Sequence, residues 1–232
     1  MKLATLKELN AERAARRPVI VVTDTATGEQ RLVKAGDFAA DPLRAELSKQ
    51  LRMGKSSTIE ANGRKLFLNV YAPTARMVIV GAVHISQALA PLARSLDYDV
   101  TVVDPRTAFA SPERFPDVPL IAEWPDVALP PLNIDHYTAF VALTHDPKID
   151  DPALLHAFER DCFYIGALGS RKTHAKRAER LKAQGAKDGD IERIHAPIGL
   201  SIGAVSPSEI AVAIMAEITA QLRLPREKEA AA

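Results

Sequence analysis

The chain from residue 76 onward alternates compact apolar runs with segments of helical spacing. Met77–Val80, Asp99–Val103 and Ala139–Leu143 are short and apolar, which is typical of buried strands. Ile85–Leu96 has helical spacing and lies between the first two runs. Parallel strands need such crossovers, so the pattern predicts an α/β fold with a Rossmann-like, doubly wound parallel sheet over residues 76–224. Other expected elements are strands at Pro119–Ala122 and Cys162–Ile165, a helix that begins at Asp151-Pro152, and helices at Arg171–Gln184 and Ser208–Leu222.

The first 75 residues have a different pattern, which predicts a small α+β domain. Asp41-Pro42 is a helix start signal, and the helix is expected to end near Met53. Asn62-Gly63 between two alternating apolar runs is a strong hairpin signal. The expected strands are Val19–Val22, Gln30–Val33, Ser57–Glu60 and Lys65–Tyr71.

The small size of this first domain, residues 1–75, is relevant to oligomerisation. It is small for a unit that must bury its own core, so a homo-oligomer is a plausible source of additional buried surface. At the other end of the chain, residues 225–232 (PREKEAAA) have nothing apolar to dock, and we expect this tail to be frayed.

Composition and charge exclude several classes of protein. The chain is 47% apolar and 25% charged, which is typical of a soluble globular protein and not of a disordered or fibrous one. Its net charge of +1 creates no overall field that would attract nucleic acid or an anionic membrane. The single cysteine, Cys162, allows no intramolecular disulfide and is interpreted as an inert buried thiol. A charged N-terminus and the lack of a long apolar run predict a cytoplasmic protein.

Candidate binding residues follow the predicted strands. Ligands of an open parallel sheet bind beyond the carboxyl ends of the strands, so the residues at that edge are the first place to look. Four segments there carry glycine or polar side chains, and any anion binding by this nearly neutral chain must be local. These segments are Gly81–Ser86, Asp104–Arg106, Thr144–Pro147 and Gly166–Lys172.

The first segment is a modified dinucleotide fingerprint. Gly81 follows a strand, but Val83 and Ser86 occupy the positions of the second and third glycines, and a valine side chain would crowd a pyrophosphate. Asp104 lies near where an acidic residue binds a ribose hydroxyl. The segment therefore indicates either a site for NAD or another adenine nucleotide, or only a tight strand-to-helix turn.

The segment from Gly166 to His174 is a candidate phosphate site. Gly166 and Gly169 flank a predicted turn, and Ser170 is a suitable N-cap. Cations in the first turn of a helix interact unfavourably with the positive end of the helix dipole. An unfavourable arrangement without visible compensation indicates a functional site. The alternative is a solvated basic face. The cations are Arg171 and Lys172, with His174 nearby, and Lys176, Arg177, Arg180 and Lys182 continue the charge along the helix.

Thr144, His145 and Asp146 lie at the end of a predicted central strand. His145 and Asp146 are candidates for an acid/base pair or for two metal ligands, and His84 and His174 are close enough in the pattern to reach the same cleft. The alternative is ordinary turn chemistry at Asp146-Pro147. No H-x-x-x-H or C-x-x-C spacing supports a metal site.

These segments belong to longer runs that resemble the XdhC/CoxI family, whose members are accessory proteins for molybdenum hydroxylases such as xanthine dehydrogenase. The resemblance covers roughly Met77 to Ile218 and implies the Rossmann-like domain of that family. The matching runs are Val80–Ile85, Val102–Arg106, Leu143–Lys148, Tyr164–His174, Ile194–Leu200 and Ile202–Ala204.

The resemblance implies a non-catalytic protein that binds molybdenum cofactor (molybdopterin, a pterin that carries a phosphate) and passes it to an apo molybdenum hydroxylase subunit. Because family members also handle the sulfurated form of the cofactor, the resemblance implies a cysteine desulfurase as a further candidate partner. The chain departs from the family in lacking a Gly-Gly-Cys motif in its first 75 residues, in Val83, and in Ser201 where an acid is common. The chain thus resembles a shortened, divergent member.

Both lines of reasoning place a phosphorylated ligand at the carboxyl edge of the sheet. The two other hypotheses are an NAD-type oxidoreductase that uses Gly81 and Asp104, and a protein–protein assembly factor with a vestigial cleft. The candidate cofactor-binding residues are Gly81, His84, Asp104, Arg106, Thr144, His145, Asp146, Gly166, Gly169, Ser170, Arg171, Lys172 and His174.

Overall fold

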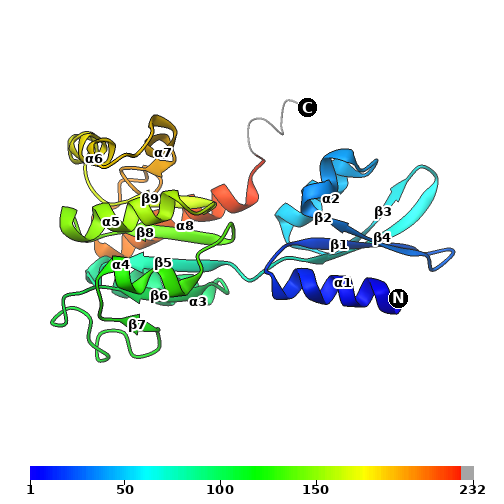
Figure 1. Ribbon diagram of the computed structural model, residues 1–232, viewed down its shortest axis with the longest axis horizontal. Helices are drawn as coiled ribbons and strands as arrows, with labels where there is room; N and C mark the ends of the chain where they lie inside the picture. Colours follow the sequence, from blue (N-terminus) through cyan, green and yellow to red (C-terminus); the bar gives the residue numbers. More distant parts are fainter. Residues whose placement is uncertain (226–232) are drawn as a thin grey trace. The chain divides into compact units, whose positions relative to one another are not determined.

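The chain forms two compact units, each built on its own sheet (Figure 1). The structure is a computed structural model that describes residues 1–225. One unit is Met1–Pro73 with the described residues from Arg223, and the other is Thr74–Leu222. The predicted mixed α/β class is confirmed. All of the tail predicted to be frayed except Pro225 lies outside the described residues.

The first unit contains an antiparallel sheet in the order β2-β1-β4-β3. Asn62 and Gly63 both have positive φ angles, 52° and 71°, as a tight hairpin turn requires, so the predicted hairpin is confirmed. Ile20, Leu47 and Leu68 lie at the centre of its core. The strands are β1 (Val19–Asp24), β2 (Gln30–Lys34), β3 (Ser57–Ala61) and β4 (Arg64–Tyr71); the helices are α1 (Leu3–Ala14), the 3-10 helix η1 (Ala35–Ala40) and α2 (Arg44–Met53).

The second unit contains a parallel sheet in the order β10-β9-β8-β5-β6-β7. This is the Rossmann order, in which the chain starts at the centre, builds one half and then returns to build the other. The predicted doubly wound sheet is therefore confirmed. The strands are β5 (Arg76–Val80), β6 (Asp99–Val103), β7 (Leu120–Ile121), β8 (Thr138–Ala142), β9 (Tyr164–Ala167) and β10 (Ile194–His195).

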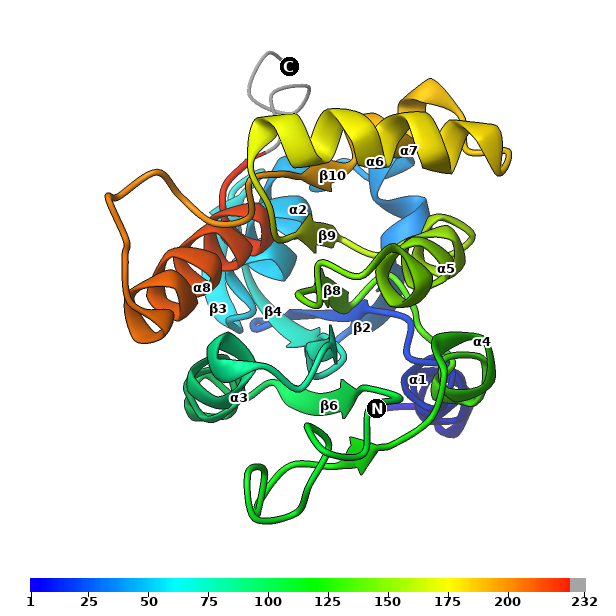
Figure 2. The ribbon, with the colours of Figure 1, turned by 90° about the vertical axis from the view of Figure 1, so that its left-hand side faces the viewer.

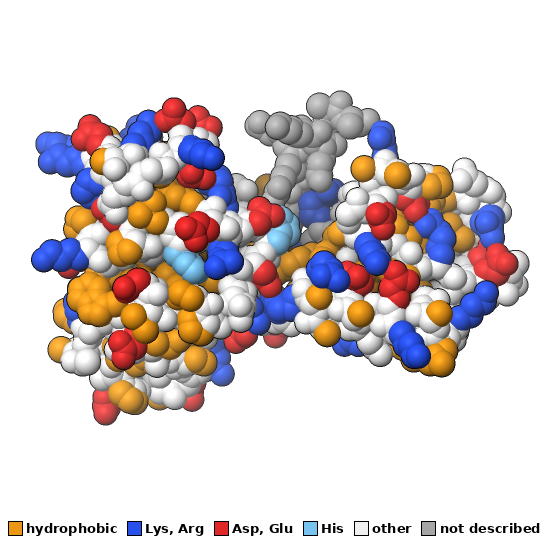
Figure 3. All heavy atoms as spheres, viewed as in Figure 1, with side chains coloured by type: hydrophobic (Ala, Val, Ile, Leu, Met, Phe, Trp, Pro, Cys, Tyr) orange, Lys and Arg blue, Asp and Glu red, His pale blue; other side chains and the backbone are white. Residues whose placement is uncertain are grey.

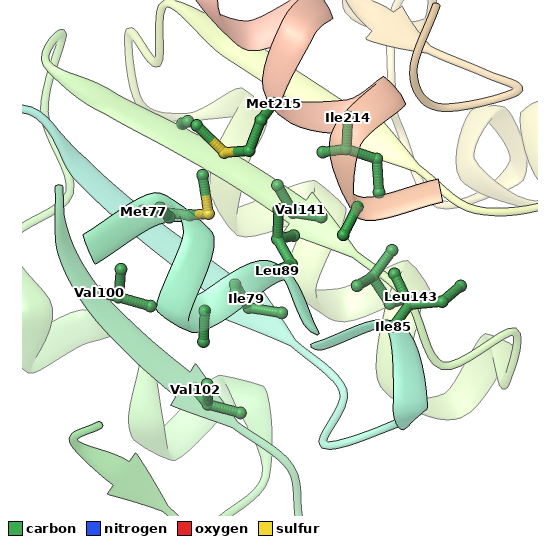
Figure 4. Close-up of a cluster of buried hydrophobic side chains, with 14 of the residues drawn as sticks. Met77, Ile79, Ile85, Leu89, Val100, Val102, Val141, Leu143, Ile214 and Met215 are labelled. Carbon is green, nitrogen blue, oxygen red and sulfur yellow. The ribbon is translucent and has the colours of Figure 1, made fainter. Parts of the chain in front are cut away.

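Helices cover both faces of this sheet (Figure 2). Alternate strand residues face opposite sides, so Met77 and Ile79 pack under α3 and α8 (Figure 4), whereas Val78 and Val80 pack under α4, α5 and α6. Each face is thus buried, which explains why the central strands are apolar throughout. The helices are α3 (His84–Ser95), α4 (Pro125–Ala128), the 3-10 helix η2 (Pro130–Leu132), α5 (Pro147–Phe158), α6 (Arg171–Ala183), α7 (Asp188–Glu192) and α8 (Pro207–Arg223).

Predicted boundaries differ from the observed ones at α5 and β9. The helix expected to begin at Asp151-Pro152 begins at Pro147, because the Asp146 side chain accepts a hydrogen bond from Lys148 N (2.9 Å) and caps it there. Both Asp-Pro pairs carry the same start signal, and the first prevails. Strand β9 begins at Tyr164, two residues after the expected position at Cys162.

Acidic and basic side chains are intermixed on the face shown in Figure 3, in keeping with the nearly neutral charge. Among residues 1–225, no helix is both long and apolar enough to cross a membrane.

Candidate functional site

The sheet order reverses direction between β5 and β8, and the loops that follow these two strands meet there. Gly81 has a φ of 117°, and its N–H donates to Val103 O (2.8 Å). A Cβ at this position would lie 2.8 Å from Thr144 Cγ2, which is closer than real Cβ atoms approach. Gly81 is therefore required both for its backbone angle and for the close approach of the loop after β8.

Ser86, at the third position of the glycine pattern, ties this turn to the start of α3. It is buried, its hydroxyl donates to Gly81 O, and its oxygen accepts from Val83 N (3.4 Å). The serine thus replaces a glycine by forming hydrogen bonds with the turn itself. Val83 is half-buried at the helix start, and His84 lies exposed beside it.

Asp104 is fully buried at the end of β6, and its carboxylate is occupied by the protein. It accepts hydrogen bonds from Ala82 N (2.7 Å) and from Arg106 N (2.9 Å), Nε (2.9 Å) and Nη2 (2.7 Å). Burial opposes its ionisation, but these hydrogen bonds outweigh burial and lower the pKa of Asp104. A carboxylate has about four acceptor positions, so a ribose hydroxyl would have to displace Arg106.

Arg114 holds the loop after β6 against the Gly81 turn. Its Nη1 donates to Ala82 O and Phe109 O, both at 2.8 Å, and its Nη2 donates to Gln87 Oε1 (2.9 Å). The Arg106 guanidinium lies 4.4 Å from the centre of the Phe109 ring, a cation–π distance. Arg106 is thus part of the scaffold of this edge.

The loop after β8 is organised by a residue that the sequence patterns did not single out, Asp150. This buried carboxylate accepts hydrogen bonds from Thr144 Oγ1 (2.6 Å), Thr144 N (3.2 Å) and His145 N (3.0 Å). It holds His145 at a φ of 61°, with the imidazole exposed. Asp146 caps α5 through Lys148 N, so its carboxylate is directed to the helix start.

The turn after β9 lies against His145. Gly169 has a φ of 133°, and a Cβ there would lie 3.7 Å from His145 Nδ1. Gly166, by contrast, lies inside β9, where a Cβ would collide with Tyr164 and Ile198, so its role is in packing. Ser170 caps α6 as predicted, since its hydroxyl accepts from Thr173 N (3.2 Å).

Arg171 and Lys172 are exposed at the start of α6, but the basic face expected to continue along the helix is not all solvated. Arg177 is 2% exposed, and its Nη2 donates to Leu168 O (2.7 Å) and lies 3.9 Å from Asp150 Oδ2. Arg180 is half-buried and pairs with Asp151 (2.7 Å). The alternative interpretation, a solvated basic face, is wrong for Arg177. The position of Arg177, four residues before the buried Leu181, was the available signal.

The Arg177 guanidinium has unpaired hydrogen-bond donors. Among residues 1–225, its Nε and Nη1 and the Nδ1 of His174 are buried without a hydrogen-bond partner. Burial lowers the pKa of Arg177 and of His174. Arg177 is thus a buried cation with two unpaired nitrogen atoms, in the same helix as the exposed Arg171 and Lys172, and such cations pair readily with oxyanions.

The structure therefore brings together most of the candidate segments. Gly81 contacts Thr144, Asp104 binds the Gly81 turn, and His145 lies beside Gly169. His84 is exposed at the helix start and Gly166 is inside its strand. Within residues 1–225, no group of three or more His, Cys, Asp or Glu side chains is arranged to hold a metal ion.

Cys162 is expected to resist alkylation in the folded protein. Its side chain is buried, and burial raises the pKa of its thiol to about 12, so the reactive thiolate is scarce at neutral pH. Iodoacetamide should label the native protein at least about tenfold more slowly than the denatured protein, as measured by intact mass. Equal labelling rates in the two states would contradict this burial.

Comparisons with known proteins agree with the fold and point to a family. Residues 77–218, more than half of the chain, match the model of the XdhC Rossmann domain. The chain is 32% identical over 154 residues to a Bacillus subtilis protein described as a probable subunit of xanthine dehydrogenase, and the match covers 66% of this chain and 44% of that protein. It is 31% identical over 159 residues to the molybdenum cofactor insertion chaperone PaoD of Escherichia coli, where the match covers 68% and 43%.

The chain spans less than half the length of the curated relatives it matches. A crystal structure described as a xanthine dehydrogenase from Bacillus halodurans superposes with a TM-score of 0.66 over 96% of this chain and 65% of that one. At 24% identity, this likeness shows a shared fold.

Proposed function

The chain belongs to the family of the XdhC Rossmann domain, and from this we propose that it is an accessory protein that holds molybdenum cofactor and delivers it to an apo molybdenum hydroxylase. The family resemblance noted in the sequence is thus confirmed. The names of two relatives, a molybdenum cofactor insertion chaperone and a probable xanthine dehydrogenase subunit, support this maturation role.

The start of α6 is the observation that carries the proposal. Arg171 and Lys172 are exposed there, beside the first backbone N–H groups of the helix, and the buried Arg177 lies further along the same helix. Arg171 and Lys172 suit the phosphate of the cofactor, because a phosphate accepts several charged hydrogen bonds, and the buried Arg177 adds positive charge in the same helix. The cofactor is the cargo of this protein, and Gly169, Ser170 and His174 complete the proposed phosphate site.

The acidic groups at this edge favour ligand binding over catalysis. Asp104 and Asp150 are both buried, and their oxygen atoms are engaged by the loops they organise. A dinucleotide oxidoreductase would use Asp104 for the ribose, which these contacts disfavour. We therefore propose a non-catalytic role in the cytoplasm. The receiving partner is the apo hydroxylase subunit, a cysteine desulfurase is a second partner, and self-association remains part of the proposal.

Replacing Arg171 with alanine is expected to weaken binding of molybdenum cofactor. A charge-assisted hydrogen bond contributes roughly 1.5–3 kcal/mol, so the dissociation constant should rise about tenfold or more. Lys176→Ala, on the same helix and also exposed, is the matched control and should leave affinity within about twofold. Binding is measured anaerobically with the purified full chain.

The outcomes separate the hypotheses. Equal losses in the two variants would indicate general charge attraction and would contradict a phosphate site at Arg171. A wild-type protein that binds no cofactor but still captures a hydroxylase subunit would replace the proposal with the assembly factor.

A further inference from the structure

Three titratable side chains form a hydrogen-bonded cluster at the end of β10, outside the site described above. The Glu217 carboxylate, on α8, accepts from the Tyr164 hydroxyl (2.5 Å), from Gly199 N (2.8 Å) and from His195 Nδ1 (3.1 Å). The His195 ring also stacks on Tyr164, with the ring centres 4.6 Å apart. The orientation of this imidazole is therefore set on two sides.

The cluster determines which nitrogen of His195 carries the proton. Burial opposes ionisation of Glu217, but the hydrogen bonds from His195 and Tyr164 outweigh it and lower the pKa of Glu217, whereas burial raises the pKa of Tyr164. An ionised carboxylate can only accept, so His195 Nδ1 carries a hydrogen, and in the neutral imidazole Nε2 is then the nitrogen with a lone pair to offer. Within the described residues His195 Nε2 forms no hydrogen bond, and the side chain is 27% exposed.

His195 lies at the same edge of the sheet as the proposed cofactor site. It is the last residue of β10 and pairs in register with Gly166 of β9, the strand that leads into the Gly169 turn. The following loop packs closely against α8, because a Cβ on Gly199 would lie 3.0 Å from the carbonyl carbon of Ala213. The imidazole is thus oriented at the carboxyl end of β10, on the face of the sheet that α8 covers.

We propose that His195 contacts the ligand directly, through Nε2, by accepting a hydrogen bond from an N–H group on the edge of a nitrogen heterocycle. Glu217 is a positioning residue that keeps Nε2 free by binding Nδ1. This inference rests on the proposed function, since the pterin of molybdenum cofactor carries such N–H groups. The amino group of an adenine nucleotide has the same chemistry, and the experiment distinguishes the two sources.

Two amide substitutions separate a ligand contact from a purely structural role. His195→Asn places an N–H group near the position of Nδ1 and can still bind Glu217, but it removes Nε2. His195→Gln extends an amide to the position of Nε2 and gives up the Nδ1 contact. The control is His136, which has the same Nδ1–carboxylate pairing, with Asp161 (3.0 Å), but precedes β8 at the opposite edge of the sheet.

Anaerobic binding of molybdenum cofactor and of ATP to the full chain tests the proposal, with the melting temperature as the check of folding. We expect His195→Asn to melt like the wild type but to bind cofactor about tenfold more weakly, His195→Gln to retain more affinity than His195→Asn, and His136→Asn to stay within about twofold. If ATP binds and its affinity changes in this way across the three variants, His195 still contacts the ligand, and that ligand is an adenine nucleotide.

Other results overturn the proposal. Wild-type affinity for cofactor in a folded His195→Asn protein would refute the contact alone and leave the proposed function intact. A wild-type protein that binds neither ligand would refute the proposed function and, with it, this inference.

Discussion

Arg177→Met is expected to lower the free energy of unfolding of the second unit by about 3 kcal/mol, because removal of one partner of a buried ion pair leaves the other charge uncompensated. The substitution would leave Asp150 without its nearby cation and Leu168 O without its donor. The measurement is chemical denaturation of the full chain, followed by circular dichroism.

Lys176→Met is the matched control, since this residue precedes Arg177 on α6 but is exposed. A folding free energy for Arg177→Met within about 0.5 kcal/mol of the wild type would contradict the role assigned to this pair.

Gly81→Ala is expected to be the second strongly destabilising change, at about 3 kcal/mol, because strain and overpacking add. A backbone φ of 117° is unfavourable for alanine, and the new methyl group would meet Thr144 at 2.8 Å. The loops after β5 and β8 would be forced apart, and cofactor affinity should fall as well. Chemical denaturation and anaerobic cofactor binding of the full chain measure the two effects.

Gly189→Ala is the control for Gly81→Ala, because a methyl group added at Gly189 would have no heavy atom within 4 Å and the residue has no positive φ. It should match the wild type in both stability and binding. A Gly81→Ala protein that unfolds at the same denaturant concentration as Gly189→Ala would show that the close approach at Thr144 is not required.

Local patterns predicted much of the second unit. Strands β5, β6 and β8 are short apolar runs, and the N-cap Ser170 is a single-residue signal for α6, so each is determined by neighbours in sequence. Helix α1 was missed because Leu3 and Leu6 are exposed and Leu9 alone of its leucines is buried, which leaves little apolar periodicity.

Contacts between distant segments could not be predicted in this way. Asp150 organises the β8 loop and Arg177 comes from α6, so their pairing depends on the packing of α5 against α6. Asp104 looked available for a ribose because the sequence does not show that Arg106 and Ala82 occupy it. The sequence indicated His195 only as part of a run that resembles the family. Its pairing with Glu217 was not predictable, because Glu217 lies 22 residues away.

A crystal structure of the protein with molybdenum cofactor bound would test most directly whether this edge holds a phosphorylated cargo. We expect electron density for the phosphate at the start of α6, within hydrogen-bond distance of the Arg171 side chain and of backbone N–H groups after Ser170. Density for the phosphate at the opposite edge of the sheet, near His136, or an Arg171 side chain directed into solvent beside a cofactor bound elsewhere, would contradict the account.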